Sequence, residues 1–139
     1  SKAETEAKTE ASIRGMHILL AEDNELNMKI AEFMLQNEGA VVTKTWNGQE
    51  AVEIFEKSRP DEFDVILMDI MMPVMNGYEA AKRIRSLDRE DAQVIPIIAM
   101  TANAFVEDRM KAKEAGMNEH IGKPVDGKLL VKVIHELVE

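Results

Sequence analysis

The chain has 139 residues, no cysteine and a formal net charge of -9, and its length suits a single domain. The lack of cysteine excludes disulfides and zinc–thiolate sites and fits a reducing cytosol. Because Lys and Arg form no cluster, the acidic balance argues against binding of nucleic acid or direct contact with an anionic membrane. We therefore expect a cytoplasmic domain, and we leave open whether the parent protein is anchored in a membrane.

The first residues of the chain are charged and polar. Ile13 is the only large apolar residue among residues 1–15. Such a composition buries too little surface to become ordered. We predict a flexible leader or linker over residues 1–15 and one folded domain over residues 16–139.

The folded part begins with the predicted strand His17–Ala21, and the predicted helix Glu25–Asn37 follows it. Gly39, just beyond this helix, is placed to cap its end. Val41–Thr43 is predicted as the second strand. Residues at helical spacing indicate the apolar face of the helix: Leu26, Ile30, Phe33 and Met34.

The middle of the chain continues the alternation of predicted strands and helices. Asn47 is expected to cap a second helix. The apolar run Phe63–Asp69 predicts a buried strand that ends in a carboxylate. A third helix is expected to start after Asn76 and Gly77, and Ile95–Met100 is predicted as the fourth strand.

The last third of the chain contains a helix near Phe105–Ala115, a short strand Glu119–Ile121 and a final helix. The helix near Phe105 has the weakest apolar stripe and should be the easiest element to shift. Apolar residues define one face of the final helix: Leu129, Leu130, Val133, Ile134 and Leu137. Five strands alternating with five helices predict an α/β, doubly wound, flavodoxin-like parallel sheet of strand order 2-1-3-4-5.

In folds of this kind the functional crevice forms at the carboxyl ends of the strands. Several of the predicted strands are followed there by polar side chains. They are Glu22 with Asp23, Asp69, Thr101 and Lys123. Three clustered carboxylates repel one another unless cations intervene. Lys123 offsets one charge, and carboxylate oxygens suit Mg²⁺ or Mn²⁺. A carboxylate beside a metal and a lysine can accept a phosphoryl group, and the hydroxyl of Thr101 can reach that group.

Each of these residues has a simpler interpretation when it stands alone. Asp69 could end a strand as a turn residue, and Glu22 with Asp23 could cap the first helix. Thr101 could be a solvated turn residue, and Lys123 a surface charge. Their joint occurrence at successive strand ends favours phosphoryl transfer.

Four stretches of the sequence resemble the receiver domains of two-component response regulators: Ile18–Asn24, Val65–Gly77, Ile97–Ala102 and Ala115–Pro124. The resemblance covers roughly residues 16–138. It implies the CheY-like form of the flavodoxin-like fold and a phosphorelay receiver, which takes a phosphoryl group from a phosphohistidine and switches conformation.

The resemblance assigns roles to the residues around the predicted crevice. Asp69 matches the phosphorylated aspartate. Asp23 matches a direct metal ligand, and Glu22 matches its acidic neighbour. The backbone carbonyl of Met71 matches the third protein ligand of Mg²⁺. Met71 and Asn103 also match positions that tune hydrolysis, and because an apolar Met71 cannot orient water, we predict slow self-dephosphorylation.

The remaining roles concern the switch. Thr101 matches the switch hydroxyl, and Lys123 matches the lysine that contacts the phosphoryl group, with a cis bond to Pro124. The second switch position is usually Tyr or Phe, but here it is His120. Receivers of hybrid sensor histidine kinases often carry this histidine, and the stretch Gly116–Pro124 resembles them too. His120 keeps two open interpretations, a switch residue or a half-buried packing residue.

We therefore predict a phosphoacceptor domain rather than an enzyme, in a hybrid sensor histidine kinase or, alternatively, as a stand-alone regulator. The expected partner is a histidine kinase or a histidine phosphotransfer domain, and the expected state is a monomer or weak dimer. Two rival classes fit less well. A flavodoxin-like cofactor binder would meet the charges of Glu22 and Asp23, and a haloacid-dehalogenase-type phosphatase would need an aspartate where Met71 stands.

Overall fold

The computed structural model describes residues 12–102 and 106–138. Its sheet has five parallel strands in the order β2-β1-β3-β4-β5, as predicted. The strands are β1 (His17–Ala21), β2 (Val41–Thr45), β3 (Val65–Asp69), β4 (Ile97–Thr101) and β5 (Glu119–Gly122). Every residue of β3 and β4 is buried, because helices cover both faces of the sheet.

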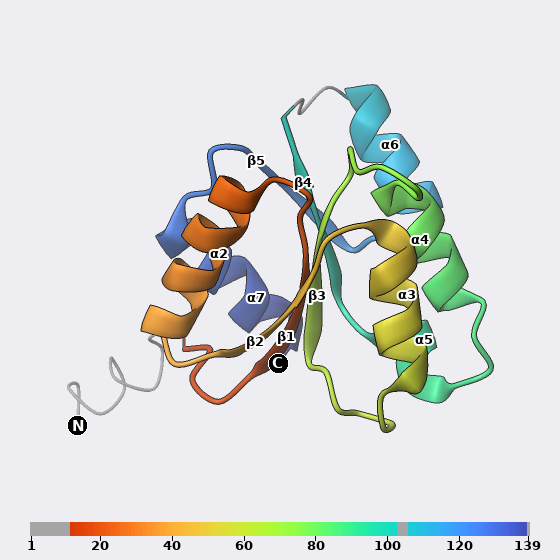
Figure 1. The fold of residues 1–139 in the computed structure, drawn as a ribbon, viewed down its shortest axis with the longest axis horizontal. Helices are drawn as coiled ribbons and strands as arrows, with labels where there is room; N and C mark the ends of the chain where they lie inside the picture. Colours follow the sequence, from red (N-terminus) through yellow and green to blue (C-terminus); the bar gives the residue numbers. More distant parts are fainter. Residues whose placement is uncertain (1–11, 103–105, 139) are drawn as a thin grey trace.

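Two layers of helices enclose the sheet (Figure 1). The helices are α2 (Glu25–Asn37), α3 (Gly48–Lys57), α4 (Gly77–Arg85), α5 (Glu90–Val94), α6 (Val106–Glu114) and α7 (Gly127–Val138). Helices α2 and α7 cover one face, and α3, α4, α5 and α6 lie on the other. None of the helices in residues 12–102 and 106–138 combines the length and apolar character needed to cross a membrane.

The described residues form six helices, one more than predicted, and the additional helix is the short α5. Arg89 precedes it and donates hydrogen bonds to both carboxylate oxygens of Asp91. The same guanidinium donates to the carbonyls of Phe55, Ser58 and Arg59 and lies 4.8 Å from the centre of the Phe55 ring. This helix is held by contacts with the end of α3. Its own five residues are too few to show a periodic apolar pattern, so the sequence did not predict it.

Asparagine side chains begin three of the helices. Asn47 caps α3, as expected. Asn76 caps α4, which begins at Gly77 rather than after it. Asn24 caps α2 by accepting a hydrogen bond from a backbone N–H one turn later. Asn24, rather than Glu22 or Asp23, is therefore the N-cap of α2. Glu22 contributes by accepting a hydrogen bond from the N–H of Asn24 at 3.1 Å.

The predicted apolar face of α2 is wrong in part. Leu26, Ile30 and Phe33 are exposed at 65%, 49% and 71%. The buried residues of α2 are instead Met28, Ala31 and Leu35. Both sets recur at helical spacing, so the periodicity of the sequence alone could not distinguish the face that packs on the sheet from the face that meets solvent. Leu129 of α7 is likewise half exposed, at 48%.

Residues 12–15 are packed against the domain. Ile13 is fully buried in the core between the sheet and the α2–α7 layer. The N–H of Gly15 donates to the carbonyl of Gly39 at 2.8 Å. The packed unit therefore begins before the predicted boundary at residue 16. The flexibility predicted for residues 1–11 lies outside the described residues.

Candidate functional site

The predicted site residues meet at the carboxyl edge of the sheet. Glu22 follows β1, Asp69 ends β3, Thr101 ends β4 and Lys123 follows β5. Strands β1 and β3 are neighbours, and so are β3 and β4. Because all strands are parallel, their carboxyl ends lie along the same edge. The strand order thus gathers four side chains that are far apart in the sequence.

Three carboxylates form a compact acidic cluster. One oxygen from each of Glu22, Asp23 and Asp69 lies within 4.8 Å of the others. Glu22 and Asp69 are buried, at 2% and 4% exposure, whereas Asp23 is exposed. An oxygen-only donor set that is open to solvent on one side suits Mg²⁺, which retains several waters and is completed by a phosphate oxygen. The chemistry of this cluster therefore fits the predicted metal, and the same oxygens would accept Mn²⁺.

Lys123 joins two members of the cluster. Its Nζ lies 2.9 Å from Oε2 of Glu22 and 2.9 Å from Oδ2 of Asp69. Its backbone N–H donates to the carbonyl of Thr101 at 2.8 Å. The peptide bond between Lys123 and Pro124 is cis, as the resemblance implied. One ammonium thus faces two buried carboxylates, which leaves negative charge at the site for a cation to neutralise.

Burial and neighbouring charges shift the pKa values of Asp69 and Lys123. Burial raises the pKa of Asp69 from 3.8 to about 6, the hydrogen bond from Lys123 opposes this rise, and the charge of Glu22 adds to it. Burial alone would lower the pKa of Lys123, but its hydrogen bonds to Glu22 and Asp69 outweigh burial and raise that pKa. Lys123 therefore stays charged, while Asp69 keeps its proton to a higher pH than an ordinary aspartate does.

The raised pKa of Asp69 predicts a pH-dependent stability. The folded chain holds this proton more tightly than the unfolded chain, so without metal the free energy of unfolding falls as pH rises through the interval from 3.8 to about 6. We expect Asp69→Asn to be more stable than wild type by about 1–2 kcal/mol at pH 7.5 in EDTA, with the gain vanishing near pH 4. Urea denaturation at both pH values measures this difference. The exposed Asp88→Asn serves as control, and an equal gain at both pH values would contradict the prediction.

Thr101 and Met71 differ in their burial: Thr101 is 7% exposed and Met71 is 77% exposed. Thr101 ends β4, and Met100 before it is in register with Asp69. Met71 lies two residues beyond Asp69. The position of Thr101 suits a switch hydroxyl, and the backbone carbonyl of Met71 stays a predicted ligand. Asn103, predicted to tune hydrolysis, lies outside the described residues.

His120 lies in β5, the edge strand next to β4. It is in register with Ala99, and its Nδ1 lies 3.5 Å from a carboxylate oxygen of Glu119. A quarter of its side chain, 25%, is exposed. This partial burial is compatible with both interpretations of His120, the switch residue and the packing residue.

Gly77 supports the site in a way that the sequence analysis missed. Its N–H donates to the carbonyl of Ile70 at 2.9 Å. A Cβ at this position would overlap the backbone carbonyl of Asp69. Only glycine therefore lets the start of α4 pack directly against the end of β3. The sequence signal was present as the pair Asn76-Gly77, but it indicated only the start of a helix.

Comparison with known proteins agrees with this geometry. The response regulator receiver domain family matches residues 18–135. Histidine kinase 1 of Arabidopsis thaliana is 35% identical over 164 aligned positions, which cover 96% of this chain and 14% of that protein. The chain thus spans about one seventh of the length of this kinase.

Two solved structures are informative neighbours. The receiver domain of a Pseudomonas aeruginosa sensor histidine kinase, with magnesium coordinated in its active-site cleft, is 40% identical, with a TM-score of 0.80 and coverage of 89% of this chain and 98% of that one. The other is a Saccharomyces cerevisiae histidine phosphotransfer protein in complex with the receiver domain of its downstream response regulator. That match has 32% identity, a TM-score of 0.78 and coverage of 89% of each chain.

The family match, the strand order and the strand-end side chains agree with one another. They set aside the two rival classes, the flavodoxin-like cofactor binder and the phosphatase. The chain belongs to the response regulator receiver domain family.

Proposed function

We propose that this domain is a phosphorelay receiver that accepts a phosphoryl group from phosphohistidine onto Asp69. The observation that carries the proposal is the position of the Asp69 carboxylate, which lies within 4.8 Å of the oxygens of Glu22 and Asp23 and 2.9 Å from the ammonium of Lys123. The magnesium in the Pseudomonas neighbour and the phosphotransfer protein in the yeast complex support this function. A histidine kinase or a histidine phosphotransfer domain is the proposed donor.

The chemistry follows from the residues at the site. An oxygen of ionised Asp69 attacks phosphorus, the O–P bond forms, the P–N bond to histidine breaks, and the imidazole leaves. With a pKa of about 6, Asp69 is mostly ionised at pH 7.5. Lys123 places a fixed positive charge where the oxygens of the transferred group gather. Mg²⁺ held by Glu22, Asp23, Asp69 and the carbonyl of Met71 would supply further positive charge to those oxygens.

The proposed output is a conformational change that starts at Thr101. Its hydroxyl moves toward the new phosphoryl group, and the shift at the end of β4 changes the position of α6. Helix α6 is weakly anchored, since Ala112 is buried whereas Val106 and Met110 are exposed at 67% and 58%. The face formed by α6, β5 and α7, which includes His120 of β5, is therefore the proposed readout surface. We also propose slow self-dephosphorylation, as the apolar Met71 predicts.

The parent protein is proposed to be a hybrid sensor histidine kinase, because the Arabidopsis relative is a far longer histidine kinase. The stand-alone regulator is the alternative. In either setting the domain acts in the cytoplasm as a phosphoacceptor rather than as an enzyme with turnover, with Mn²⁺ able to replace Mg²⁺, and as a monomer or weak dimer.

Intact-mass measurement after incubation with acetyl phosphate and Mg²⁺ tests the acceptor. We expect one phosphoryl adduct on the wild type, none on Asp69→Asn, and loss of the adduct in EDTA. Asp88→Asn, an exposed carboxylate, should keep the adduct. An adduct that persists in Asp69→Asn, or a wild type that stays unlabelled under conditions that label a known receiver, would refute the proposal.

A further inference from the structure

The guanidinium of Arg85, the last residue of α4, joins parts of the fold that lie far apart in the sequence. Its Nε donates to the carbonyl of Gly116 at 2.9 Å, and its Nη2 donates to Oδ1 of Asn118 at 2.9 Å. Its Nη1 donates to the carbonyl of Ala92 in α5 at 3.0 Å. Burial lowers the pKa of Arg85, yet the guanidinium stays charged at neutral pH, so these hydrogen bonds are charge-assisted. One side chain thus holds the end of α4, the helix α5 and the turn after α6 together.

Gly116 lets Arg85 lie directly on the backbone of that turn. Its φ of +94° is in the region that favours glycine. The turn closes α6 with two hydrogen bonds, from the N–H of Gly116 to Lys113 at 3.0 Å and from the N–H of Met117 to Ala112 at 2.9 Å. A Cβ on Gly116 would lie 2.8 Å from Cγ of Arg85. The carboxyl end of α6 is therefore a closed turn with the Arg85 side chain packed against it.

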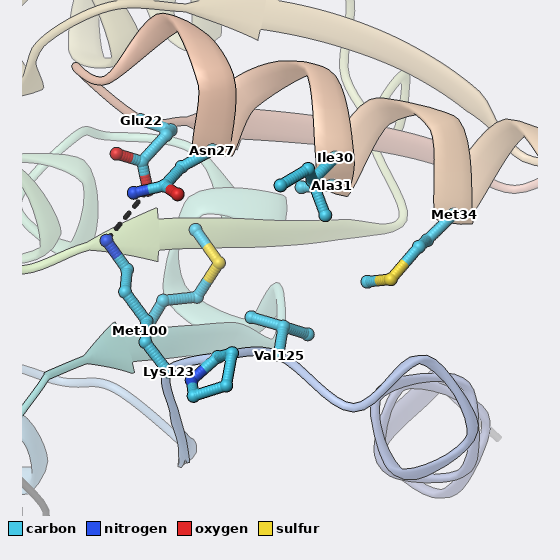
Figure 2. Close-up of a pocket in the computed structure, with 9 residues that line it drawn as sticks. Glu22, Asn27, Ile30, Ala31, Met34, Met100, Lys123 and Val125 are labelled. Atoms are coloured by element: carbon cyan, nitrogen blue, oxygen red, sulfur yellow. Dashed lines mark hydrogen bonds and ion pairs between the residues drawn. The ribbon is translucent and has the colours of Figure 1, made fainter.

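The same turn is bonded to the start of β4. Oδ1 of Asn118 accepts a hydrogen bond from the N–H of Ile97 at 2.8 Å, and the N–H of Asn118 donates to the carbonyl of Ile97 at 2.8 Å. Ile97 begins β4, and Thr101 ends it. Figure 2 shows the carboxyl end of this strand, where Met100 lies in the wall of the same pocket as Lys123. Strand β4 therefore extends from the turn that Arg85 holds to the proposed acceptor site.

The two ends of α6 are anchored unequally. The carboxyl half places Ala112 in the core, and the turn beyond it is bonded to Arg85. At the amino end Val106 is 67% exposed, and Tyr78 of α4 donates to the carbonyl of Asp108 over 3.4 Å, a length at which a hydrogen bond is weak. Because α6 runs back toward the start of β4 (Figure 1), its loosely held end lies toward the carboxyl edge of the sheet.

We propose that Arg85 is a positioning residue of the switch, which pins the carboxyl end of α6 so that phosphorylation of Asp69 tilts this helix about Gly116. The inference rests on the function proposed above, because the motion starts from a phosphoryl group on Asp69. A rigid helix that is held at one end rotates about that end when the other end is displaced. The displacement is therefore largest at Val106, and a partner that distinguishes the two states contacts the amino-terminal half of α6.

The length of α6 makes this tilt a small motion. With a rise of about 1.5 Å per residue, Val106 and Glu114 lie about 12 Å apart along the axis. A tilt of about 10° then moves the amino end by about 2 Å and keeps the turn at Gly116 intact. A displacement of the whole helix by the same distance would instead stretch the hydrogen bonds from Arg85 to Gly116 and Asn118 beyond bonding length. The bonds of Arg85 thus favour the tilt.

Spin labels at the two ends of α6 test the tilt. The chain has no cysteine, so Glu56→Cys on α3 can serve as the reference and be paired with Val106→Cys or with Glu114→Cys, all at exposed positions. Pulsed electron paramagnetic resonance gives each distance before and after incubation with acetyl phosphate and Mg²⁺, and intact mass gives the adduct in the same samples. We expect phosphorylation to change the distance to residue 106 by about 2 Å or more and the distance to residue 114 by less than half as much. Asp69→Asn should show neither change.

Three further variants, each placed in both spin-label pairs, test the part played by Arg85. Arg85→Met removes the charge and all three hydrogen bonds, and Arg85→Lys keeps the charge but lacks the planar fork of donors. Arg83→Met makes the same change at an exposed position of α4, as control. We expect the change at residue 114 to equal that at residue 106 in Arg85→Met, to be intermediate in Arg85→Lys and to match the unsubstituted pairs in Arg83→Met. Thermal melting confirms folding, and Arg85→Lys carries the test if Arg85→Met does not fold.

The remaining outcomes separate this inference from the proposed function. A distance to residue 114 that stays fixed in the folded Arg85 variants would overturn the assignment to Arg85. Equal changes at both ends of α6 in the phosphorylated protein with Arg85 intact, or no change at residue 106, would overturn the tilt while leaving Asp69 as acceptor. A protein with both Asp69 and Arg85 intact that takes up no phosphoryl group would overturn the proposed function itself.

Discussion

Replacing Lys123 with methionine should slow phosphorylation of Asp69 by acetyl phosphate about a hundredfold or more. Lys123 Nζ lies 2.9 Å from Asp69 and 2.9 Å from Glu22, so its charge is in place before the phosphoryl group arrives. The oxygens of that group carry spread negative charge during transfer. Methionine keeps the length of the side chain and removes the charge, and rates of adduct formation by intact mass at saturating Mg²⁺ measure the effect.

The control for this experiment is Lys128→Met. Lys128 is an exposed lysine near the start of α7, and its loss should leave the rate within about twofold, because exposed charges contribute little. In EDTA, Lys123→Met should also lower the free energy of unfolding at pH 7.5, because two buried carboxylates then lack their shared cation. Equal labelling rates for Lys123→Met and wild type would show that the metal alone neutralises the phosphoryl group.

Truncating Ile13 to alanine should lower the free energy of unfolding by about 2–4 kcal/mol. Ile13 is fully buried in the core beside α2 and α7, so alanine leaves a cavity that the neighbouring side chains cannot fill completely. For a chain of this size the midpoint of thermal unfolding should fall by roughly 10 °C. Circular dichroism during heating and urea titration give the two values.

Two comparisons isolate the contribution of Ile13. Leu26→Ala removes an aliphatic side chain that is 65% exposed, and it should cost less than about 1 kcal/mol. Deleting residues 1–15 should destabilise the domain at least as much as Ile13→Ala, whereas deleting residues 1–11 tests the predicted leader separately. Wild-type stability in the chain that begins at Met16 would contradict the role of Ile13.

The sequence predicted the features that follow from local patterns. The helix Glu25–Asn37 and the strand His17–Ala21 have the predicted bounds, because apolar periodicity and caps lie within the segment itself. The grouping of the acidic cluster with Lys123 was predictable as well, because parallel strands bring their carboxyl ends to one edge. The distances that join Lys123 to Glu22 and Asp69 required the structure.

Features that depend on contacts between residues far apart in the chain could not be predicted from the sequence. Helix α5 depends on the guanidinium of Arg89, which reaches carbonyls at the end of α3. Ile13 looked isolated in a polar segment, yet it fills a space between elements that arrive later in the chain. The buried face of α2 was assigned wrongly because Ala31 packs where a larger residue was expected, while Phe33 is exposed. In each case tertiary packing decides among local alternatives.

The position of β3 has a consequence for how the molecule opens. The strand that ends in Asp69 is the middle one of five and pairs with β1 and β4 along its length. Its amide protons can exchange with solvent only when both ladders separate, so they should be among the slowest to exchange. Strand β5, at the edge, and the thinly anchored α6 can open at much lower cost. Asp69 thus belongs to the unit that we expect to unfold last, whereas the proposed readout surface contains the elements that we expect to open first.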